Sequence, residues 1–162
     1  MSASRVGFGF DVHPFADGEG GDRVLVLGGV AFPEERPLAG HSDADVVAHA
    51  VADAVLGAAG LGDLGMHFPD TDPAWHNAES IGILGACVRL AEKAGLCFVN
   101  ADCTIICERP KIAPERDRMI ALLSSVAGGP VHVKATRPEG LGSLGRVEGI
   151  ACMAVVLLET TG

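Results

Sequence analysis

Three side chains in the first third of the chain have the types and spacing of a metal site. Asp11 and His13 lie two residues apart after an apolar run, and His49 lies on the polar side of an otherwise apolar segment. Together they offer one carboxylate oxygen and two imidazole nitrogens to a single divalent cation, and the sequence offers no obvious fourth protein ligand. Three protein ligands with one open position are typical of catalytic rather than structural zinc. Taken singly, each pattern fits a solvated surface better than a metal site.

Two neighbouring segments suit an anionic or hydroxylated ligand. His41 and Ser42 precede a predicted helix, where free backbone N–H groups and the helix dipole favour anions. The loop 62–73 is rich in acceptors for hydroxyl groups, although its Asp-Pro turns also fit a plain solvated connection. A metal site and an anion site would then flank one helix.

A third segment has the composition of a phosphate-binding loop. Residues 134–146 combine cations, the carboxylate of Glu139 and glycines that let the backbone approach a phosphate closely. Glu139 could hold a harder cation such as Mg²⁺, and Arg146 offers a bidentate clamp. Lys111 follows a predicted strand, where ligands of open sheets tend to bind. The alternatives are a long hairpin connection and a surface cation.

The elements that must position these groups follow from the spacing of apolar residues. Side chains two apart in a strand share a face, so Asp11 and His13 should project together, with Val12 turned into the core. A helix should begin with Ser42 as its N-cap and end at Gly60. The first two predicted strands should form a hairpin or bulged meander. The predicted strands are 5–13, 24–27, 96–107, 131–136 and 150–158, and the predicted helices are 42–59, 78–94 and 115–126.

The interleaving of these elements predicts an α+β (or α/β) fold, a mixed sheet with helices on one face. The length of 162 residues and a hydrophobic fraction of 48% fit a single domain over 1–162. The net charge of -9 argues against a nucleic-acid or anionic-membrane surface. Five cysteines without a C-x-x-C pair indicate buried free thiols, and no stretch is apolar and long enough for a signal peptide or a membrane span. A soluble, cytoplasmic protein is expected.

Several longer motifs resemble one known family. The segments 9–13, 38–50, 61–65 and 68–73 are similar, in order and spacing, to the 2-C-methyl-D-erythritol 2,4-cyclodiphosphate synthase family of the non-mevalonate isoprenoid pathway. The resemblance implies a homotrimer with the sheets around a central axis and active sites between neighbouring subunits. It implies a phosphorus-oxygen lyase that converts 4-diphosphocytidyl-2-C-methyl-D-erythritol 2-phosphate into the cyclodiphosphate and releases CMP.

The resemblance also implies roles for individual residues. Zn²⁺ would be bound by Asp11, His13 and His49, and a second divalent ion, Mg²⁺ or Mn²⁺, by Glu139. His41 would be a catalytic group; Arg137 is a second catalytic candidate, on chemical grounds rather than from the resemblance. A central channel that can hold an isoprenoid diphosphate would be lined by Phe10, Arg146 and Glu148. The substrate, a cytidine diphosphate compound, would contact Asp11, Val12, His13, His41, Ser42, Asp63, Leu64, Gly65, Phe68, Pro69, Asp70, Thr71, Asp72, Cys107, Lys111, Ile112, Ala113, Ala135, Thr136, Glu139 and Arg146.

The implied reaction needs no protein nucleophile, and we assign no general base. The substrate's own 2-phosphate attacks the β-phosphorus, and aligned intramolecular attack can lower a barrier by roughly 7–11 kcal/mol. The chain departs from the family at Arg137-Pro138, where a second hydroxyl residue is usual, and at Ser143, where an aromatic is usual. On chemical grounds, Arg137 is expected to present a cation to the diphosphate instead.

Two other classes of function remain compatible with these residues. A metal-dependent nucleotide phosphohydrolase would use the same cations but would release inorganic phosphate. A catalytically silent trimer that binds isoprenoid diphosphates would keep Arg146 and Glu148 and form no CMP. The intact set of Asp11, His13 and His49 disfavours the silent trimer.

Overall fold

A four-stranded mixed sheet forms the centre of the computed structural model, which describes residues 3–18, 23–69, 71–75 and 78–161. Its strand order is β1-β6-β4-β5, with β6 antiparallel to both of its neighbours and β4 parallel to β5. A separate antiparallel hairpin contains two short strands. The strands are β1 (Ser4–Pro14), β2 (Leu25–Leu27), β3 (Val30–Phe32), β4 (Leu96–Ile106), β5 (Val131–Thr136) and β6 (Gly149–Thr160).

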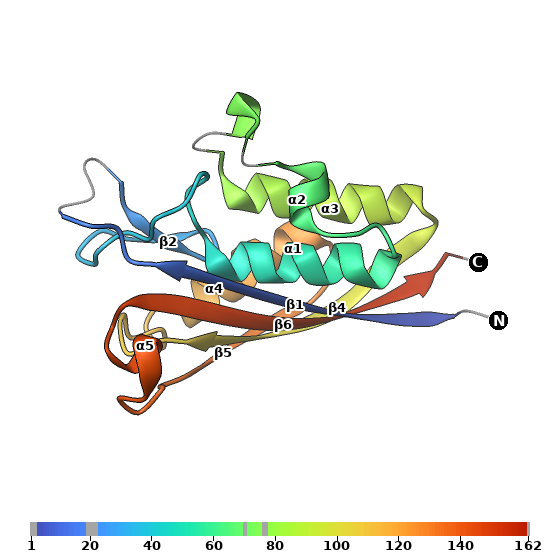
Figure 1. Ribbon diagram of the computed structural model, residues 1–162. Coiled ribbons are helices and arrows are strands. Elements are labelled where there is room, and N and C mark those ends of the chain that lie inside the picture. Colours follow the sequence, from blue (N-terminus) through green and yellow to red (C-terminus); the bar gives the residue numbers. More distant parts are fainter. Residues whose placement is uncertain (1–2, 19–22, 70, 76–77, 162) are drawn as a thin grey trace.

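The three long helices lie on one face of this sheet (Figure 1). Helix α1 contacts β1, β4 and β6, while α3 packs between α1 and α4. The mixed sheet with helices on one face confirms the predicted α+β class. The helices are α1 (Val46–Ala59), α2 (Leu64–His67), α3 (Ser80–Lys93), α4 (Arg116–Ala127) and α5 (Gly142–Gly145), with a 3-10 turn η1 at Pro73–Trp75.

Two glycines let α1 lie directly on β1. A Cβ added at Gly9 would stand 1.9 Å from the carbonyl oxygen of Ala50, and one at Gly7 would stand 1.9 Å from that of Ala54. Real Cβ atoms never approach an oxygen so closely, so any larger residue would push the helix away from the strand. The close approach places the first turns of α1 over the far end of β1, where Asp11 and His13 lie.

The N-terminus of α1 is capped by Asp45, so the predicted N-cap Ser42 is wrong. The Asp45 carboxylate accepts the backbone N–H groups of Val47 and Ala48. It also accepts those of Gly28 and Gly29, at 2.8 and 2.7 Å, in the turn between β2 and β3. Asp45 is fully buried and ties the hairpin to the helix, which the sequence pattern alone does not reveal. Gly60 ends the helix in a left-handed conformation, as predicted.

The predicted N-terminal hairpin and the predicted inward direction of Val12 are also wrong. Strand β1 pairs with β6 along its whole length, from Ser4 opposite Glu159 to Pro14 opposite Gly149. Asp11 and His13 share the face that α1 covers, so strand alternation turns Val12 to the other face, where it is 47% exposed. That outer face is apolar: its exposed side chains include Val6, Phe8, Phe10, Val12, Met153 and Val155.

All five cysteines, each within the described ranges, carry free thiols, as predicted. Four are buried, and Cys97 is half-buried. In the part of the chain that the structure describes, no helix combines the length and apolar character that a membrane span requires.

Candidate metal centre and substrate cavity

Asp11, His13 and His49 meet at the end of β1 that α1 covers. Asp11 Oδ2 lies 3.2 Å from His13 Nε2 and 3.0 Å from His49 Nδ1. One ligand atom from each residue lies within 4.8 Å of the other two, and all three side chains are half-buried. The cluster predicted from the sequence therefore has the spacing to hold one divalent cation.

The hydrogen bonds of His13 test whether this donor set fits a cation. His13 Nδ1 lies 2.9 Å from the carbonyl oxygen of Ala39, which can only accept, so Nδ1 carries the proton. In the neutral ring, Nε2 then presents a lone pair to a carboxylate oxygen. Two acceptors 3.2 Å apart need a proton or a metal ion between them, and a carboxylate oxygen with an imidazole nitrogen is a donor set that zinc accepts, so the residues fit a metal ion.

The pKa values of Asp11 and His13 support a charged site. Burial acts to raise the pKa of Asp11, but hydrogen bonds and charge interactions with His13 and His49 lower it well below the ordinary range. Burial acts to lower the pKa of His13, but the hydrogen bond and charge of Asp11 raise it overall. The carboxylate is therefore ionised at neutral pH and ready to bind a cation.

The cluster opens into a cavity of about 570 Å³. Besides the three metal-ligating candidates, six residues predicted from the sequence line it. Trp75, which the sequence analysis missed, packs edge-to-face on Phe68 at 4.9 Å between ring centroids and closes one wall. It is the only tryptophan of the chain and follows a Pro-containing turn, a pattern that could have singled it out. The full lining is Asp11, His13, Gly40, His41, Ser42, His49, Leu64, Gly65, Phe68, Pro69, Trp75 and Ile83.

Arg23 supports the rim of this cavity and was also missed. Its guanidinium donates to the carbonyl oxygen of Gly40 at 2.8 Å and to that of Ser42, so it brackets His41 from both sides. A single arginine after a Gly-rich stretch of sequence forms no distinctive pattern. Its role becomes visible only when the loop is folded.

Other predicted contacts lie outside the cavity lining. Asp63 is exposed and caps α2 by accepting the Met66 N–H at 3.0 Å. Thr71 and Asp72 are exposed, and Asp70 lies outside the described residues. Val12 projects to the opposite face of the sheet.

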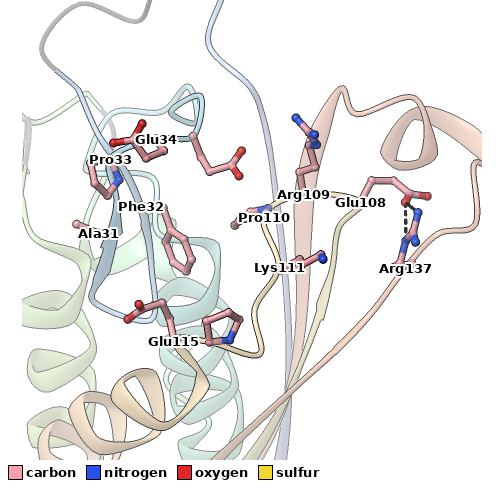
Figure 2. A pocket seen from close by; sticks show the side chains of 12 residues that line it. Ala31, Phe32, Pro33, Glu34, Glu108, Arg109, Pro110, Lys111, Glu115 and Arg137 are labelled. Carbon is pink, nitrogen blue, oxygen red and sulfur yellow. Dashed lines mark hydrogen bonds and ion pairs between the residues drawn. The ribbon is translucent and has the colours of Figure 1, made fainter.

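Lys111, one of the predicted substrate contacts, lines a second cavity, of about 640 Å³. Figure 2 shows Phe32 of β3 and Glu34 of the following turn on one side, and Pro110, Lys111 and Arg137 on the other. Cys107 and Ile112 are each 4% exposed and therefore offer backbone groups rather than side chains. Ala113, Ala135 and Thr136 are exposed nearby, with the Cys107 N–H donating to the Thr136 carbonyl at 3.2 Å.

Arg137 forms an ion pair in the same region. Its Nε and Nη2 atoms lie 2.9 and 2.7 Å from Glu108 Oε2 (Figure 2). The other carboxylate oxygen of Glu108 accepts the Gly140 N–H at 2.8 Å. Both hydrogen bonds lower the pKa of Glu108, the one from Gly140 more than the one from Arg137. Glu139, between Arg137 and Gly140, is exposed with a φ of 54°. The loop is thereby fastened to the end of β4.

The two groups of predicted site residues are separated within one chain. Across the sheet, Asp11 of β1 pairs with Cys152 of β6, and Cys152 pairs on its other side with Ile105 of β4. Ile105 in turn pairs with Ala135 of β5. Both groups therefore lie at the same end of the sheet, but three strand spacings apart, about 14 Å.

At the end of the β5–β6 connection, Arg146 Nε pairs with Glu148 Oε1 at 2.6 Å, and both side chains are exposed.

Comparisons with known proteins point to one family. Residues 4–159 match the YgbB family. The 2-C-methyl-D-erythritol 2,4-cyclodiphosphate synthase of Geobacillus thermodenitrificans (strain NG80-2) is 52% identical over 158 residues, 96% of each chain. The synthase of Salinibacter ruber (strain DSM 13855 / M31) is 50% identical over 159 residues, 96% of this chain and 99% of the other.

Solved structures agree in fold. The bifunctional IspDF from Campylobacter jejuni superposes with a TM-score of 0.92 at 37% identity, over 99% of this chain and 43% of that one. IspF of Plasmodium falciparum in complex with CDP superposes with a TM-score of 0.84 at 30% identity, over 99% of this chain and 98% of that one. These matches confirm the resemblance seen in the motifs: the chain belongs to the YgbB family, and its relatives are named 2-C-methyl-D-erythritol 2,4-cyclodiphosphate synthases.

Proposed function

We propose that this enzyme converts 4-diphosphocytidyl-2-C-methyl-D-erythritol 2-phosphate into 2-C-methyl-D-erythritol 2,4-cyclodiphosphate and CMP in the non-mevalonate isoprenoid pathway, as a phosphorus-oxygen lyase. The single observation that carries the proposal is the convergence of Asp11, His13 and His49 beside a cavity. It occurs in a chain 52% identical to a synthase of that name over nearly its whole length.

The substrate's erythritol and 2-phosphate would occupy the cavity beside this cluster. His41 and Ser42 stand on its rim and would contact the 2-phosphate. Gly65 and Phe68 line the wall that would face the erythritol. Asp63 and residues 69–72 would complete the contacts to its hydroxyl groups. Held in this way, the 2-phosphate would lie close to the β-phosphorus, which is the main requirement of an intramolecular attack.

Two divalent cations would assist. Asp11, His13 and His49 would hold Zn²⁺ with one position open, and Glu139 would hold Mg²⁺ or Mn²⁺. When bound, such ions act as Lewis acids and neutralise phosphate oxygens as charge shifts to the leaving CMP. Arg137 would present a further positive charge to the diphosphate, and Glu108 fixes the direction of its guanidinium.

A homotrimer would bring the two halves of the site together. The outer face of the sheet exposes Phe8 (59%), Phe10 (48%) and other apolar side chains, and a contiguous apolar surface is typical of a face that another protein covers. With the sheets arranged around a central axis, the β4–β5 end of one subunit would meet the metal cluster of its neighbour. The active site would then lie between subunits.

The cytidine would bind to the segment 107–113 with Ala135 and Thr136. The cavity beside Lys111 supports this placement, as does the CDP named in two of the similar structures. Phe10, Arg146 and Glu148 would line the trimer's central channel, where an isoprenoid diphosphate would bind. The five free thiols fit a reducing compartment, and we place the enzyme in the cytoplasm.

The test is incubation of the purified protein with the diphosphocytidyl substrate, with and without a chelator, and separation of the nucleotides by chromatography. We expect stoichiometric CMP and cyclodiphosphate with Zn²⁺ and Mg²⁺ present and none after chelation. Release of inorganic phosphate instead of CMP would contradict the proposal.

A further inference from the structure

Beyond the three proposed ligands, His49 touches two hydroxyl groups on its far side. Ser80 is the first residue of α3 and is fully buried, and its Oγ lies 2.8 Å from His49 Nε2. Ser42 Oγ lies farther from the same nitrogen, at 3.2 Å. Ser80 Oγ also bonds to Oδ1 of Asp43, whose Oδ2 accepts the Ser80 N–H at 3.1 Å. A chain of hydrogen bonds thus runs from Asp43 through Ser80 to His49.

The direction of each bond in this chain is fixed by elementary chemistry. An ionised carboxylate can only accept, so the single hydroxyl proton of Ser80 points to Asp43. Ser80 Oγ must then accept from His49, which places a proton on Nε2. The neutral ring consequently keeps its lone pair on Nδ1, the atom that lies 3.0 Å from Asp11 Oδ2 and faces the proposed cation.

Asp43 is itself held in place. Its backbone N–H donates to the carbonyl of Ala78 at 3.2 Å, and its Oδ1 accepts the N–H of Asp45 at 3.2 Å. The carboxylate therefore sits between the N-termini of α1 and α3, which limits its freedom to turn away from Ser80. The arrangement is the hydroxyl-bridged form of the carboxylate–histidine pair that commonly orients a metal-bound imidazole.

We propose that Ser80 and Asp43 are positioning residues, which fix the tautomer and the ring orientation of His49 for metal binding. This inference rests on the metal site proposed above. A merely structural role, in which the same bonds only hold two helix ends together, predicts a different outcome: stability would fall, while the affinity of the folded protein for zinc would stay the same.

The experiment measures zinc affinity and stability separately. Zinc dissociation constants come from competition with a chromophoric chelator, and the stability of the metal-free protein comes from urea unfolding. The variants are Ser80→Ala and Asp43→Asn, with Ser124→Ala as the matched control. Like Ser80→Ala, Ser124→Ala removes a hydroxyl group that makes a hydrogen bond. The Ser124 Oγ accepts the Val131 N–H at 2.9 Å, on the side of the molecule where α4 meets β5.

We expect Ser80→Ala to weaken zinc binding roughly 10- to 100-fold and Asp43→Asn about 10-fold, the range found when partners of a metal-bound histidine are removed. Ser124→Ala should bind zinc as the unmodified protein does. Equal zinc affinity in Ser80→Ala and the unmodified protein would overturn the inference, and so would an equal loss in all three variants. Should Ser80→Ala not fold, Asp43→Asn decides alone. If the unmodified protein bound no zinc, the proposed metal site itself would fail.

Discussion

The two halves of the proposed active site are built in different ways. Around Asp11, His13 and His49, packed elements of one chain hold the side chains: α1 lies directly on β1 because Gly9 has no Cβ. At the other edge of the sheet, Glu139 and Arg137 stand on an exposed loop, and the Arg137 side chain is 69% exposed.

The difference indicates which half of the site a single chain completes before the proposed assembly into a trimer. Folding of a single chain places every proposed zinc ligand, so changes there should act on metal affinity and on the free energy of unfolding. The loop half reaches the metal cluster only if a neighbouring subunit supplies it, so changes there should act on substrate turnover and leave the metal in place.

The largest effect is expected from His49→Ala, which removes a ligand from the folded half. Zinc content should fall to background, and turnover should drop roughly 10³-fold or more, as when a group that stabilises transition-state charge is lost. Elemental analysis measures the zinc content, and CMP release measures turnover. Retained zinc with normal turnover would remove His49 from the metal site.

Phe8→Asp should separate the two halves without altering either. A charge on the outer sheet face opposes burial, so analytical ultracentrifugation should find monomers of Phe8→Asp, whereas we expect the unmodified protein to sediment as a trimer. Turnover should fall at least about 100-fold, because small displacements of reacting groups are already that costly, while zinc stays bound. Leu122→Asp, an exposed apolar position on α4, is the control and should remain trimeric. A trimeric Phe8→Asp would show that this face is not the interface.

Arg137→Ala tests the loop half alone. Turnover should decrease about 10- to 100-fold with zinc content unchanged, because a cation beside the diphosphate is lost. The control is Arg118→Ala, whose side chain is also 69% exposed and pairs with Glu115 at 2.7 Å on α4. Normal turnover of Arg137→Ala would dismiss a catalytic role for this arginine.

Gly9→Ala tests the packing that builds the folded half. The added Cβ meets the Ala50 carbonyl at 1.9 Å, so α1 must shift, and overpacking of this kind lowers the free energy of unfolding by about 1–3 kcal/mol. Zinc affinity should fall as well, because His49 moves with α1. Gly82→Ala is the control: its Cβ meets nothing within 4 Å, and a helix gains roughly 0.5–1 kcal/mol from alanine. Equal stability of the two variants would contradict this account of the packing.

The smallest effect concerns the pH dependence of the loop. The pKa of Glu108 is lowered by its bonds to Gly140 and Arg137, so the ionised, bonded form is present at neutral pH and is lost as pH falls through this lowered pKa. The amide resonance of Gly140 should therefore titrate with a midpoint below the ordinary glutamate range, and should not titrate in Glu108→Gln. A midpoint at or above that range would mean that the loop is not fastened as described.

The sequence predicted the chemistry of the folded half better than its surroundings. Alternation in β1 correctly placed Asp11 beside His13, because strand periodicity is a local property. It could not say which face the helices cover. Apolar Phe8 and Val12 resemble a core face, whereas Gly7 and Gly9, on the other side of the strand, mark the face on which α1 lies.

Long-range hydrogen bonds explain why the N-cap prediction was wrong and why the contact of Ser80 was not predicted. Ser42 resembles an N-cap, but Asp45 takes that place because the N–H groups of the β2–β3 turn reach its carboxylate. Ser80 contacts His49 from 31 positions away, and no local pattern encodes such a contact. The proposed contact between the loop of Glu139 and the metal cluster would require a second chain, so neither the sequence pattern nor one folded chain contains it.

Anomalous X-ray diffraction at the zinc absorption edge from crystals of the zinc-loaded protein tests the central claim most directly. We predict one strong peak per chain, about 2.0–2.2 Å from Asp11 Oδ2, His13 Nε2 and His49 Nδ1. A peak elsewhere, or no peak near these three atoms in protein that contains stoichiometric zinc, would contradict the account.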